Sequence, residues 1–263
     1  MYFTYIKEDS IAPIAVIVSK SQNKPQTRKY IYYTETESEH TFRELRLSAE
    51  QKKTSEIIPI WFKTKNQRTC VNISAKSGAG KSVLLAKMLK EFLKLYGKEY
   101  QQNWLFTTAS ETDPAFKGLK LPRVDLEFAM DHARLEDVKD SVVVYDDAAH
   151  SGSKELDEWL FRYMLQILEK SRKLNACFVS VNHDTRAGNA TKLLNLECDA
   201  YVCFNQTNLN ATVKLLKNYL DFDKQQIDMV KKVNNGRFTY LYISKLVPYL
   251  ISQDRLIFYQ QFE

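Results

Sequence analysis

The stretch Asn72–Leu89, which decides the fold, reads NISAKSGAGKSVLLAKML. It nearly follows the pattern G-x-x-x-x-G-K-[ST] of a phosphate-binding loop, with Gly80, Lys81 and Ser82 completing the pattern. Ala75 stands where the first glycine is usual, and its single methyl group is a small steric demand. Small residues let consecutive backbone N–H groups face phosphate oxygens at a helix N-terminus. The stretch therefore predicts a nucleotide-binding loop.

Both flanks of this loop favour that interpretation. Residues 69–74 read as a strand, and apolar residues recur at helical spacing after the loop, from Val83 to Leu93. Lys81 is expected to reach the β- and γ-phosphates of ATP, and the Ser82 hydroxyl to bind Mg²⁺. The residues predicted to contact the nucleotide are Ala75, Lys76, Ser77, Gly78, Ala79, Gly80, Lys81, Ser82 and Val83. The alternative is an ordinary strand–turn–helix with a chance Gly-Lys-Ser.

A second motif is acidic: four apolar residues, Val142 to Tyr145, lead directly into Asp146 and Asp147. This resembles a Walker B strand. Asp146, at the carboxyl end of a buried strand, is predicted to hold the magnesium ion through water. Asp147 is predicted to orient or deprotonate the attacking water. The alternative is that two aspartates merely end a strand at a solvated turn.

The next strand-like run, residues 176–181, ends at Asn182 and His183. In P-loop ATPases that couple hydrolysis to movement, the strand after the Walker B strand commonly ends in a polar residue that senses the γ-phosphate. Asn182 fits this role best, with His183 as the weaker candidate. A loop asparagine without a catalytic role is the alternative. His150 is interpreted as an exposed turn residue.

The pattern of elements predicts an α/β fold. From about Thr69 onward, short apolar runs alternate with helical segments, which indicates a mostly parallel sheet flanked by helices. Before it, strand-like pieces at 12–20 and 28–36 predict a hairpin in a small N-terminal β extension. Residues 42–69 read as a charged connector. We therefore divide the chain into residues 1–66, the extension and connector, and residues 67–263, a P-loop ATPase domain.

Composition limits the class of protein. The chain has 263 residues, 44% of them hydrophobic, so it is long enough for a well-buried core. Its net charge of +6 is compatible with a nucleic-acid partner and with an ordinary protein. The four cysteines show no C-x-x-C spacing, which indicates a reducing compartment. No apolar run approaches the roughly 20 residues of a membrane span, and the start lacks a signal-peptide pattern. We expect a soluble, intracellular protein that is not secreted.

Several segments together resemble the genome-packaging ATPases of large double-stranded DNA viruses, the poxvirus-type branch of the FtsK–HerA superfamily. The resemblance runs from about Cys70 to the C-terminus. The segments that carry it are SAKSGAGKS (74–82), NWLFTTASETDPAF (103–116), VVYDD (143–147), EKSRKLN (169–175), FVSVNH (178–183) and NNGRFTYLYISKLVPYLIS (234–252). Two residues depart from the family pattern: Ala75 replaces glycine, and Asn182 stands where this family more often has glutamine.

The resemblance implies a RecA/FtsK–HerA-like P-loop fold and a homo-oligomeric ring, a pentamer or hexamer, that uses ATP and Mg²⁺ to thread double-stranded DNA into a preformed capsid. Its further partner would be the capsid or portal vertex. Its location would be the host cell cytoplasm or the viral assembly site, with retention in the virion as a further option. Arg172 would reach the neighbouring subunit's γ-phosphate, because its delocalised fork suits charge spread over phosphate oxygens. Lys173, Arg162 and Arg237 are the other candidates, and a solvated helix end is the alternative interpretation of Arg172.

Two other functions compete with the packaging motor. A cellular or plasmid DNA pump of the same superfamily would share every motif. A small-molecule P-loop kinase would need an acceptor pocket and an arginine-rich lid, and the segment 182–195 offers only Arg186. Stimulation of ATP hydrolysis by long DNA is expected of the first two functions and not of the kinase.

Overall fold

A computed structural model describes residues 1–7, 12–20, 26–61, 69–108, 116–117, 119, 121–148, 151–183, 188–233 and 240–259. Within two of its helices, nothing is described of the side chains of residues 188–191, 205–209 and 211, nor of that of residue 233. The chain forms two compact units. One contains residues Lys65–Asp199, and the other contains Met1–Thr64 together with Ala200–Glu263.

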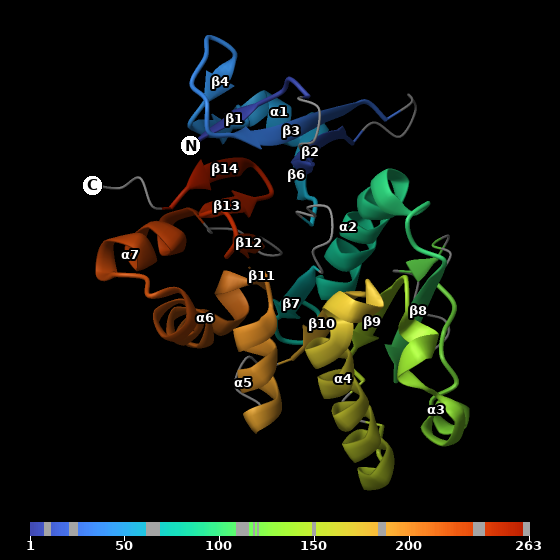
Figure 1. Ribbon diagram of the computed structural model, residues 1–263. Coiled ribbons are helices and arrows are strands. Elements are labelled where there is room, and N and C mark those ends of the chain that lie inside the picture. Colours follow the sequence, from blue (N-terminus) through green and yellow to red (C-terminus); the bar gives the residue numbers. More distant parts are fainter. Residues whose placement is uncertain are drawn as a thin grey trace. The chain divides into compact units, whose positions relative to one another are not determined.

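The unit formed by residues 65–199 is built on four strands: β7 (Cys70–Ser74), β8 (Gln102–Thr107), β9 (Ser141–Asp146) and β10 (Cys177–Asn182). They lie in the order β7-β10-β9-β8, and every neighbouring pair is parallel. All residues of β7 and β9 are buried, as expected for strands covered on both faces. The predicted strands of this region are thus confirmed. Because the strands are parallel, Ser74, Asp146 and Asn182 end at the same edge of the sheet (Figure 1).

Helices cover both faces of this four-stranded arrangement. These are α2 (Lys81–Tyr96), α3 (Leu126–His132), α4 (Lys154–Leu174) and α5 (Gly188–Glu197). The ring of Tyr163 in α4 lies 5.9 Å from that of Phe106. Ser82 in α2 contacts Asp146 in β9. Asp146 pairs with Thr107, which follows Phe106 in β8. Since successive strand residues point to opposite faces, α2 and α4 cover opposite faces.

The helix α4 shows why this segment is helical and where it ends. The Ser153 hydroxyl accepts a hydrogen bond from the Leu156 N–H at the first turn, which caps the helix. Its apolar stripe is buried and contains Leu156, Leu160, Tyr163, Met164, Ile167 and Leu168. Asn175, in the left-handed conformation with φ of 49°, ends the helix. The helix therefore packs on the core through this stripe, and the neighbouring Trp159 is half-buried.

The second unit is antiparallel throughout. One sheet has the order β4-β1-β3-β2-β6, with β1 (Tyr2–Thr4), β2 (Pro13–Ser19), β3 (Arg28–Thr34), β4 (Thr41–Phe42) and β6 (Ser55–Pro59). The predicted hairpin is confirmed, because β2 pairs with β3. The other strands of this unit run β5-β14-β13-β12-β11, with β5 (Glu44–Arg46), β11 (Ala200–Cys203), β12 (Leu241–Ser244), β13 (Tyr249–Ser252) and β14 (Arg255–Phe258).

The expectation of a mostly parallel sheet is therefore not confirmed for the whole chain. Among the strand pairs whose register is described, those joining β7, β8, β9 and β10 are parallel, and the others listed above are antiparallel. The physical reason is the short connections at 245–248 and 253–254. Turns of this length can join antiparallel strands only, because a parallel crossover needs a dozen or more residues.

The expectation of a charged connector at 42–69 is wrong for its described part. Residues 42–61 contribute to β4 and form β5, α1 (Ala49–Thr54) and β6. Ser48 and Gln51 make a reciprocal capping box at the start of α1. The apolar residues Ile57, Ile60 and Trp61 are buried in this unit. Most of the charges that suggested a linker therefore lie on exposed positions, while Lys52 is half-buried and Glu56 is buried.

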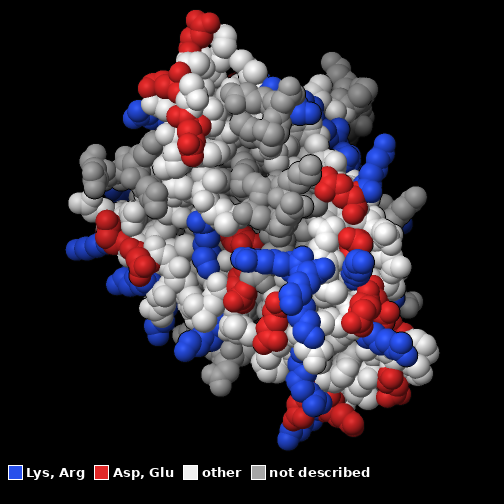
Figure 2. Space-filling view, viewed as in Figure 1, with Lys and Arg blue, Asp and Glu red and all other residues white. Residues whose placement is uncertain are grey.

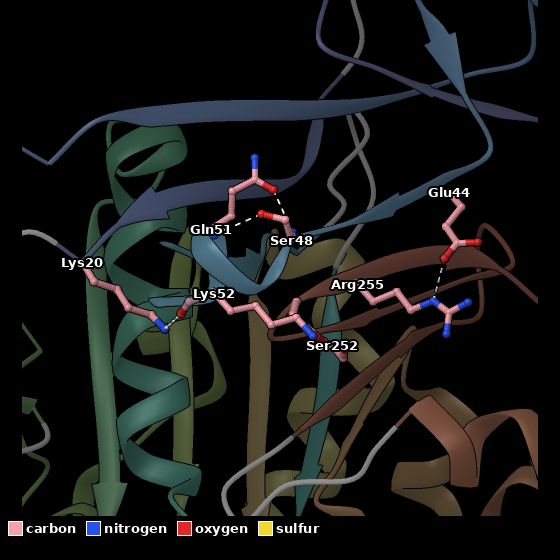
Figure 3. A network of polar contacts seen from close by, with 8 residues as sticks. Lys20, Glu44, Ser48, Gln51, Lys52, Ser252 and Arg255 are labelled. Atoms are coloured by element: carbon pink, nitrogen blue, oxygen red, sulfur yellow. Dashed lines mark hydrogen bonds and ion pairs between the residues drawn. The ribbon is translucent and has the colours of Figure 1, made fainter. Parts of the chain in front are cut away.

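Polar contacts tie the N-terminal part of this unit to its C-terminal strands (Figure 3). The Arg255 guanidinium donates to the Glu44 carboxylate at 2.9 Å, and Lys52 forms an ion pair with Asp254. Within the N-terminal part itself, the Lys20 ammonium donates to the Lys52 carbonyl at 2.9 Å. The backbone N–H of Ile57 also donates to the carbonyl of residue 253. These contacts explain why residues 1–64 group with residues 200–263.

The unit boundaries differ from the expected division at residues 66 and 67. The first boundary, between residues 64 and 65, lies close to the expected one. Residues 200–263, expected in the ATPase domain, group instead with the N-terminal residues, and they include the helices α6 (Asn205–Leu220) and α7 (Lys224–Val233). The assignment of residues 67–263 to one ATPase domain stays a prediction.

Two further features concern membrane-spanning helices and surface charge. No helix in the described part of the chain is both long and apolar enough to cross a membrane. On the face shown in Figure 2, Lys and Arg side chains lie interspersed with Asp and Glu. The basic side chains drawn on this face therefore do not form a patch free of acidic ones.

Candidate active site

The loop between β7 and α2 has the backbone turns of a phosphate cradle. Gly78 and Gly80 adopt φ values of 73° and 96°, in the left-handed region that favours glycine. Gly80 is the N-cap of α2, and no side chain caps the first N–H groups of that helix. The first turn contains no acidic residue. Uncapped N–H groups and the helix dipole together favour a bound anion at this position.

Ala75 fits its position without distortion. Its side chain is fully buried, and its N–H donates to the Asn182 carbonyl at 3.1 Å. Among the described residues other than glycine, only Asp140, Asp147, Asn175 and Asp221 have positive φ, so the backbone at residue 75 does not require glycine. The departure from the usual loop pattern is therefore compatible with the loop's conformation.

Lys81 is the central cation of the site. It is 5% exposed, and its ammonium donates to the Ala75 carbonyl at 2.8 Å and to the Lys76 carbonyl at 3.4 Å. Its third neighbour is His183 Nδ1, at 3.2 Å. Burial lowers the pKa of Lys81, and the negative charges of Asp147 and Asp146 partly oppose that shift. The loop thus holds its lysine folded back on the loop carbonyls.

Ser82 and Asp146 form the donor set expected for Mg²⁺. The Ser82 hydroxyl donates to Asp146 Oδ2 at 3.5 Å, and Asp146 is 2% exposed. No group of three or more His, Cys, Asp or Glu side chains suited to a metal occurs among the residues described. Mg²⁺ commonly takes one or two protein ligands beside nucleotide phosphates and water. A hydroxyl beside a buried carboxylate therefore fits such an ion.

Asp147 has a strained backbone that its neighbours hold in place. Its φ is 51°, which is uncommon for a residue with a side chain. Its N–H donates to the Val181 carbonyl at 3.2 Å, and its carbonyl accepts from the Thr108 hydroxyl at 2.8 Å. These two bonds anchor Asp147 to residue 108, which follows β8, and to residue 181, the last but one of β10, so that the strands on both sides of β9 hold it. Such strain at the end of a strand is typical of functional sites.

His183 connects Lys81 to Asp147. Its Nε2 lies 2.9 Å from Asp147 Oδ2, while its Nδ1 is the neighbour of the lysine. The side chain of His183 is 39% exposed and that of Asp147 is 29% exposed. His183, the weaker candidate in the sequence, is thus the residue after β10 that contacts two predicted catalytic side chains.

The side chain of Asn182 makes different contacts from that of His183. Its side-chain amide donates to Asn72 Oδ1 at 3.0 Å and to the Ser180 hydroxyl at 2.9 Å. Asn72 donates in turn to Asn195 Oδ1 in α5 at 2.8 Å. Asn182 and Ser180 share one face of β10, opposite to the face of Val181, which pairs with Asp146. The described side-chain contacts of Asn182 are therefore with the polar groups on the α5 face, and its sensor role stays a prediction.

Arg172 lies in the last turn of α4 and is exposed. Because α4 joins the end of β9 to the start of β10, its last turn lies toward the edge where those strands begin. The N–H of Asp140, just before β9, donates to the Leu174 carbonyl at 2.8 Å. The structure therefore does not bring Arg172 to its own subunit's phosphate loop, and action on a neighbouring subunit stays a prediction.

The structure describes only some of the other residues that are candidates to act on a neighbouring subunit's nucleotide. Arg162 is exposed, and its guanidinium donates to the carbonyl of Glu158 in the preceding turn of α4. Lys173 is also exposed. His150, Arg186 and Arg237 lie outside the described residues.

Sequence reasoning missed three residues that support the site: Thr108, Asn72 and Asn195. Thr108 follows β8 directly, so its place after a strand parallel to β9 is a signal that could have found it. Asn72 is a polar residue within an apolar strand, which is a second such signal. Nothing in the sequence around Asn195 marks it, because its role depends on α5 packing beside β7.

Comparison with known proteins gives distant likenesses. No protein-family model matches the chain. The chain is 26% identical over 187 residues to the uncharacterized protein V3 of Sputnik virophage, covering 70% of this chain and 74% of that protein.

The solved structures similar to this chain include a viral genome-packaging NTPase. This is B204 of Sulfolobus turreted icosahedral virus 2 in complex with AMPPCP, with 12% identity and a TM-score of 0.48 over 73% of this chain and 99% of that one. EssC (ATPases 2 and 3) of Geobacillus thermodenitrificans has 10% identity and a TM-score of 0.48 over 97% of this chain and 46% of that one. Likenesses of this strength leave the function to be argued from the residues of the site.

Proposed function

We propose that this protein is an ATPase that moves double-stranded DNA and packages a viral genome into a preformed capsid. The observation that carries the ATPase part is the meeting of Lys81 and Ser82, from the loop, with Asp146 and Asp147, from the end of β9. An uncapped helix N-terminus, a buried ammonium and a hydroxyl–carboxylate pair provide what a nucleoside triphosphate with Mg²⁺ requires.

In this proposal, each side chain has a distinct task. The N–H groups at the start of α2 and the Lys81 ammonium bind the phosphates. Ser82 and Asp146 hold Mg²⁺, which supplies charge neutralisation at the phosphate oxygens. Asp147 accepts a proton from the attacking water or orients it, because its carboxylate is partly exposed at the end of β9 and can act as a general base. Val83, 54% exposed at the start of α2, is available to contact the nucleoside.

The DNA and packaging parts of the proposal rest on other observations. The sequence resembles packaging ATPases in segments spread from about Cys70 to the C-terminus, and V3, the relative found in the comparison, is a protein of a virophage. We further propose a homo-oligomeric ring, with Arg172 or another cation completing the neighbour's site, that acts at the capsid or portal vertex. Its location would be the infected cell's cytoplasm or the viral assembly site, or the virion.

The test is ATP hydrolysis with and without long double-stranded DNA. We expect phosphate release to rise with long DNA and to be lost in Lys81→Ala, because the ammonium neutralises charge where it develops. Lys90→Ala is the matched control, since Lys90 is an exposed residue of the same helix. Near-normal hydrolysis in Lys81→Ala would contradict the ATPase proposal. Hydrolysis that ignores DNA but accelerates with a small phosphate acceptor would favour a kinase.

A cellular or plasmid DNA pump is the second candidate function, because it would use the same site. The packaging ATPase and the DNA pump differ in whether they bind a capsid. Binding of the protein to capsids assembled without a genome would support packaging. DNA-stimulated hydrolysis without capsid binding would favour the pump.

A further inference from the structure

A continuous row of polar contacts joins the phosphate loop to the end of β9 through His183. The Lys81 ammonium lies 3.2 Å from His183 Nδ1, and His183 Nε2 lies 2.9 Å from Asp147 Oδ2. The three residues come from α2, the segment after β10, and the segment after β9. Such an arrangement, in which one side chain orients the next, resembles the logic of catalytic triads in general.

The chemistry of its two neighbours decides which ring nitrogen of His183 donates. An ammonium group can only donate hydrogen bonds, so Nδ1 of His183 accepts from Lys81. Nε2 then carries the hydrogen and donates it to the carboxylate of Asp147. The imidazole therefore has a defined direction of donation, from Nε2 to Asp147.

The contact with His183 leaves one oxygen of Asp147 for chemistry. Oδ2 accepts from the imidazole, whereas Oδ1 is buried and has no partner among the residues that the structure describes. The backbone of Asp147 is held by Val181 and Thr108 in its strained conformation. The carboxylate is thus restrained at its backbone and at one oxygen, and its other oxygen keeps an unused acceptor position.

We propose that His183 is a positioning residue for Asp147, holding the carboxylate in the orientation from which it acts on the attacking water. This inference rests on the proposed ATPase function, and it assigns to His183 a role through Asp147 and not through contact with the γ-phosphate. Restraint of a reacting group matters because a displacement of about 1 Å can reduce turnover on the order of 10²-fold.

The arrangement is compatible with a bound nucleotide. Lys81 donates to three acceptors, and the longest contact is the one with the Lys76 carbonyl, at 3.4 Å. A phosphate oxygen can replace that carbonyl while the bond to His183 stays. Lys81 can therefore bind phosphate and support the imidazole at the same time.

Three substitutions separate the two contacts of His183. In His183→Gln, the amide nitrogen lies as many bonds from Cα as Nε2, so a donor to Asp147 remains. In His183→Asn, the amide oxygen corresponds to Nδ1, so an acceptor for Lys81 remains and the donor to Asp147 is lost. His183→Ala removes both. Since His183 is 39% exposed, these changes are expected to leave the fold intact, which thermal unfolding would check.

The experiment measures kcat for ATP hydrolysis and the Kd of a non-hydrolysable ATP analogue in the full-length protein. We expect kcat to fall on the order of 10²-fold in His183→Ala and His183→Asn, and to stay within about 10-fold of wild type in His183→Gln. The Kd should stay within about 3-fold in all three variants, because the phosphates are bound by Lys81 and the helix N-terminus. A purely structural histidine would lower the unfolding temperature without this order among the variants.

A double-mutant cycle tests the coupling. In an Asp147→Asn background, His183→Ala should lower kcat no further, because the carboxylate that it positions is already gone. Additive losses in the two variants would overturn the inference. So would unchanged or faster hydrolysis in His183→Ala, or equal retention in His183→Asn and His183→Gln. If the wild-type protein itself fails to hydrolyse ATP, the proposed function is wrong, and this outcome is separate from those that overturn the role of His183 alone.

Discussion

The Ser82 hydroxyl lies 3.5 Å from Asp146 Oδ2, although 64 residues separate the two in the chain. Ser82 belongs to the first turn of α2 and Asp146 is the last residue of β9. They meet because β7 and β9 are parallel and end at the same edge of the sheet. This pair gives the position of the proposed Mg²⁺ site. It also distinguishes Asp146, proposed to hold Mg²⁺, from Asp147, proposed to act on the attacking water.

We predict different losses when each aspartate becomes asparagine. Asp147→Asn keeps the shape of the side chain and the Ser82–Asp146 pair, so ATP should still bind while turnover falls about 10²-fold or more, as on loss of a general base. Asp146→Asn should instead weaken Mg²⁺-dependent ATP binding. Titration with a fluorescent ATP analogue, with and without Mg²⁺, and steady-state hydrolysis measure both. If Asp147→Asn abolishes binding, the two roles are exchanged.

Ala75→Gly should leave nucleotide binding nearly unchanged. The φ of residue 75 is not in the left-handed region, and its methyl group is fully buried. Glycine would lose the buried methyl and gain freedom in the unfolded chain, which should lower the free energy of unfolding by about 1 kcal/mol. Urea unfolding and the Kd for ATP measure the two effects. A tenfold gain in ATP affinity would show that the alanine restricts phosphate binding after all.

Arg172→Ala should reduce hydrolysis by about 10³-fold with little change in ATP affinity, if this residue acts on a neighbour's nucleotide as arginine fingers do. Its own site is remote from it, so mixing Arg172→Ala with Lys81→Ala subunits should restore activity at interfaces that pair an intact loop with an intact arginine. DNA-stimulated phosphate release across mixing ratios is the measurement, with ring assembly checked at each ratio.

Lys170→Ala is the control for that experiment, because Lys170 is an exposed cation of the same helix. Mixed rings whose activity never exceeds that of the separate variants would remove Arg172 from the site. Arg162, Lys173 and Arg237 would then be tested in the same way.

In the unit that contains both chain termini, packing should matter more than surface ion pairs. The rings of Phe3 and Phe258 stack at 4.0 Å and are almost fully buried, so Phe258→Ala should lower the free energy of unfolding by about 3–5 kcal/mol. Glu44→Ala removes the partly exposed pair with Arg255 and should cost less than about 1 kcal/mol. Chemical denaturation of both variants is the measurement. Equal losses would contradict this ranking.

Local sequence patterns were sufficient for the elements around the nucleotide loop. The strands at 70–74 and 141–146 and the helix after Gly80 follow from apolar runs and helical spacing, which depend on neighbouring residues only. The loop pattern and the double aspartate marked Lys81, Ser82, Asp146 and Asp147 for the same reason. Chemistry at such sites requires particular residue types beside a strand or helix end, so it leaves a local signature.

Tertiary structure alone decided how residues 42–61 pack and which side chains after β10 enter the site. The charged residues at 42–61 suggested a linker, but Ile57 and Trp61 are buried because residues 1–64 pack with residues 200–263. His183 contacts Lys81 and Asp147 while Asn182 donates to Asn72, because successive residues at the end of β10 point in different directions. Pairings of this kind join residues about a hundred positions apart, as with Lys81 and His183, and no local pattern encodes them. The sequence by itself determined which chemistry the site can hold, and packing decided which side chains meet there.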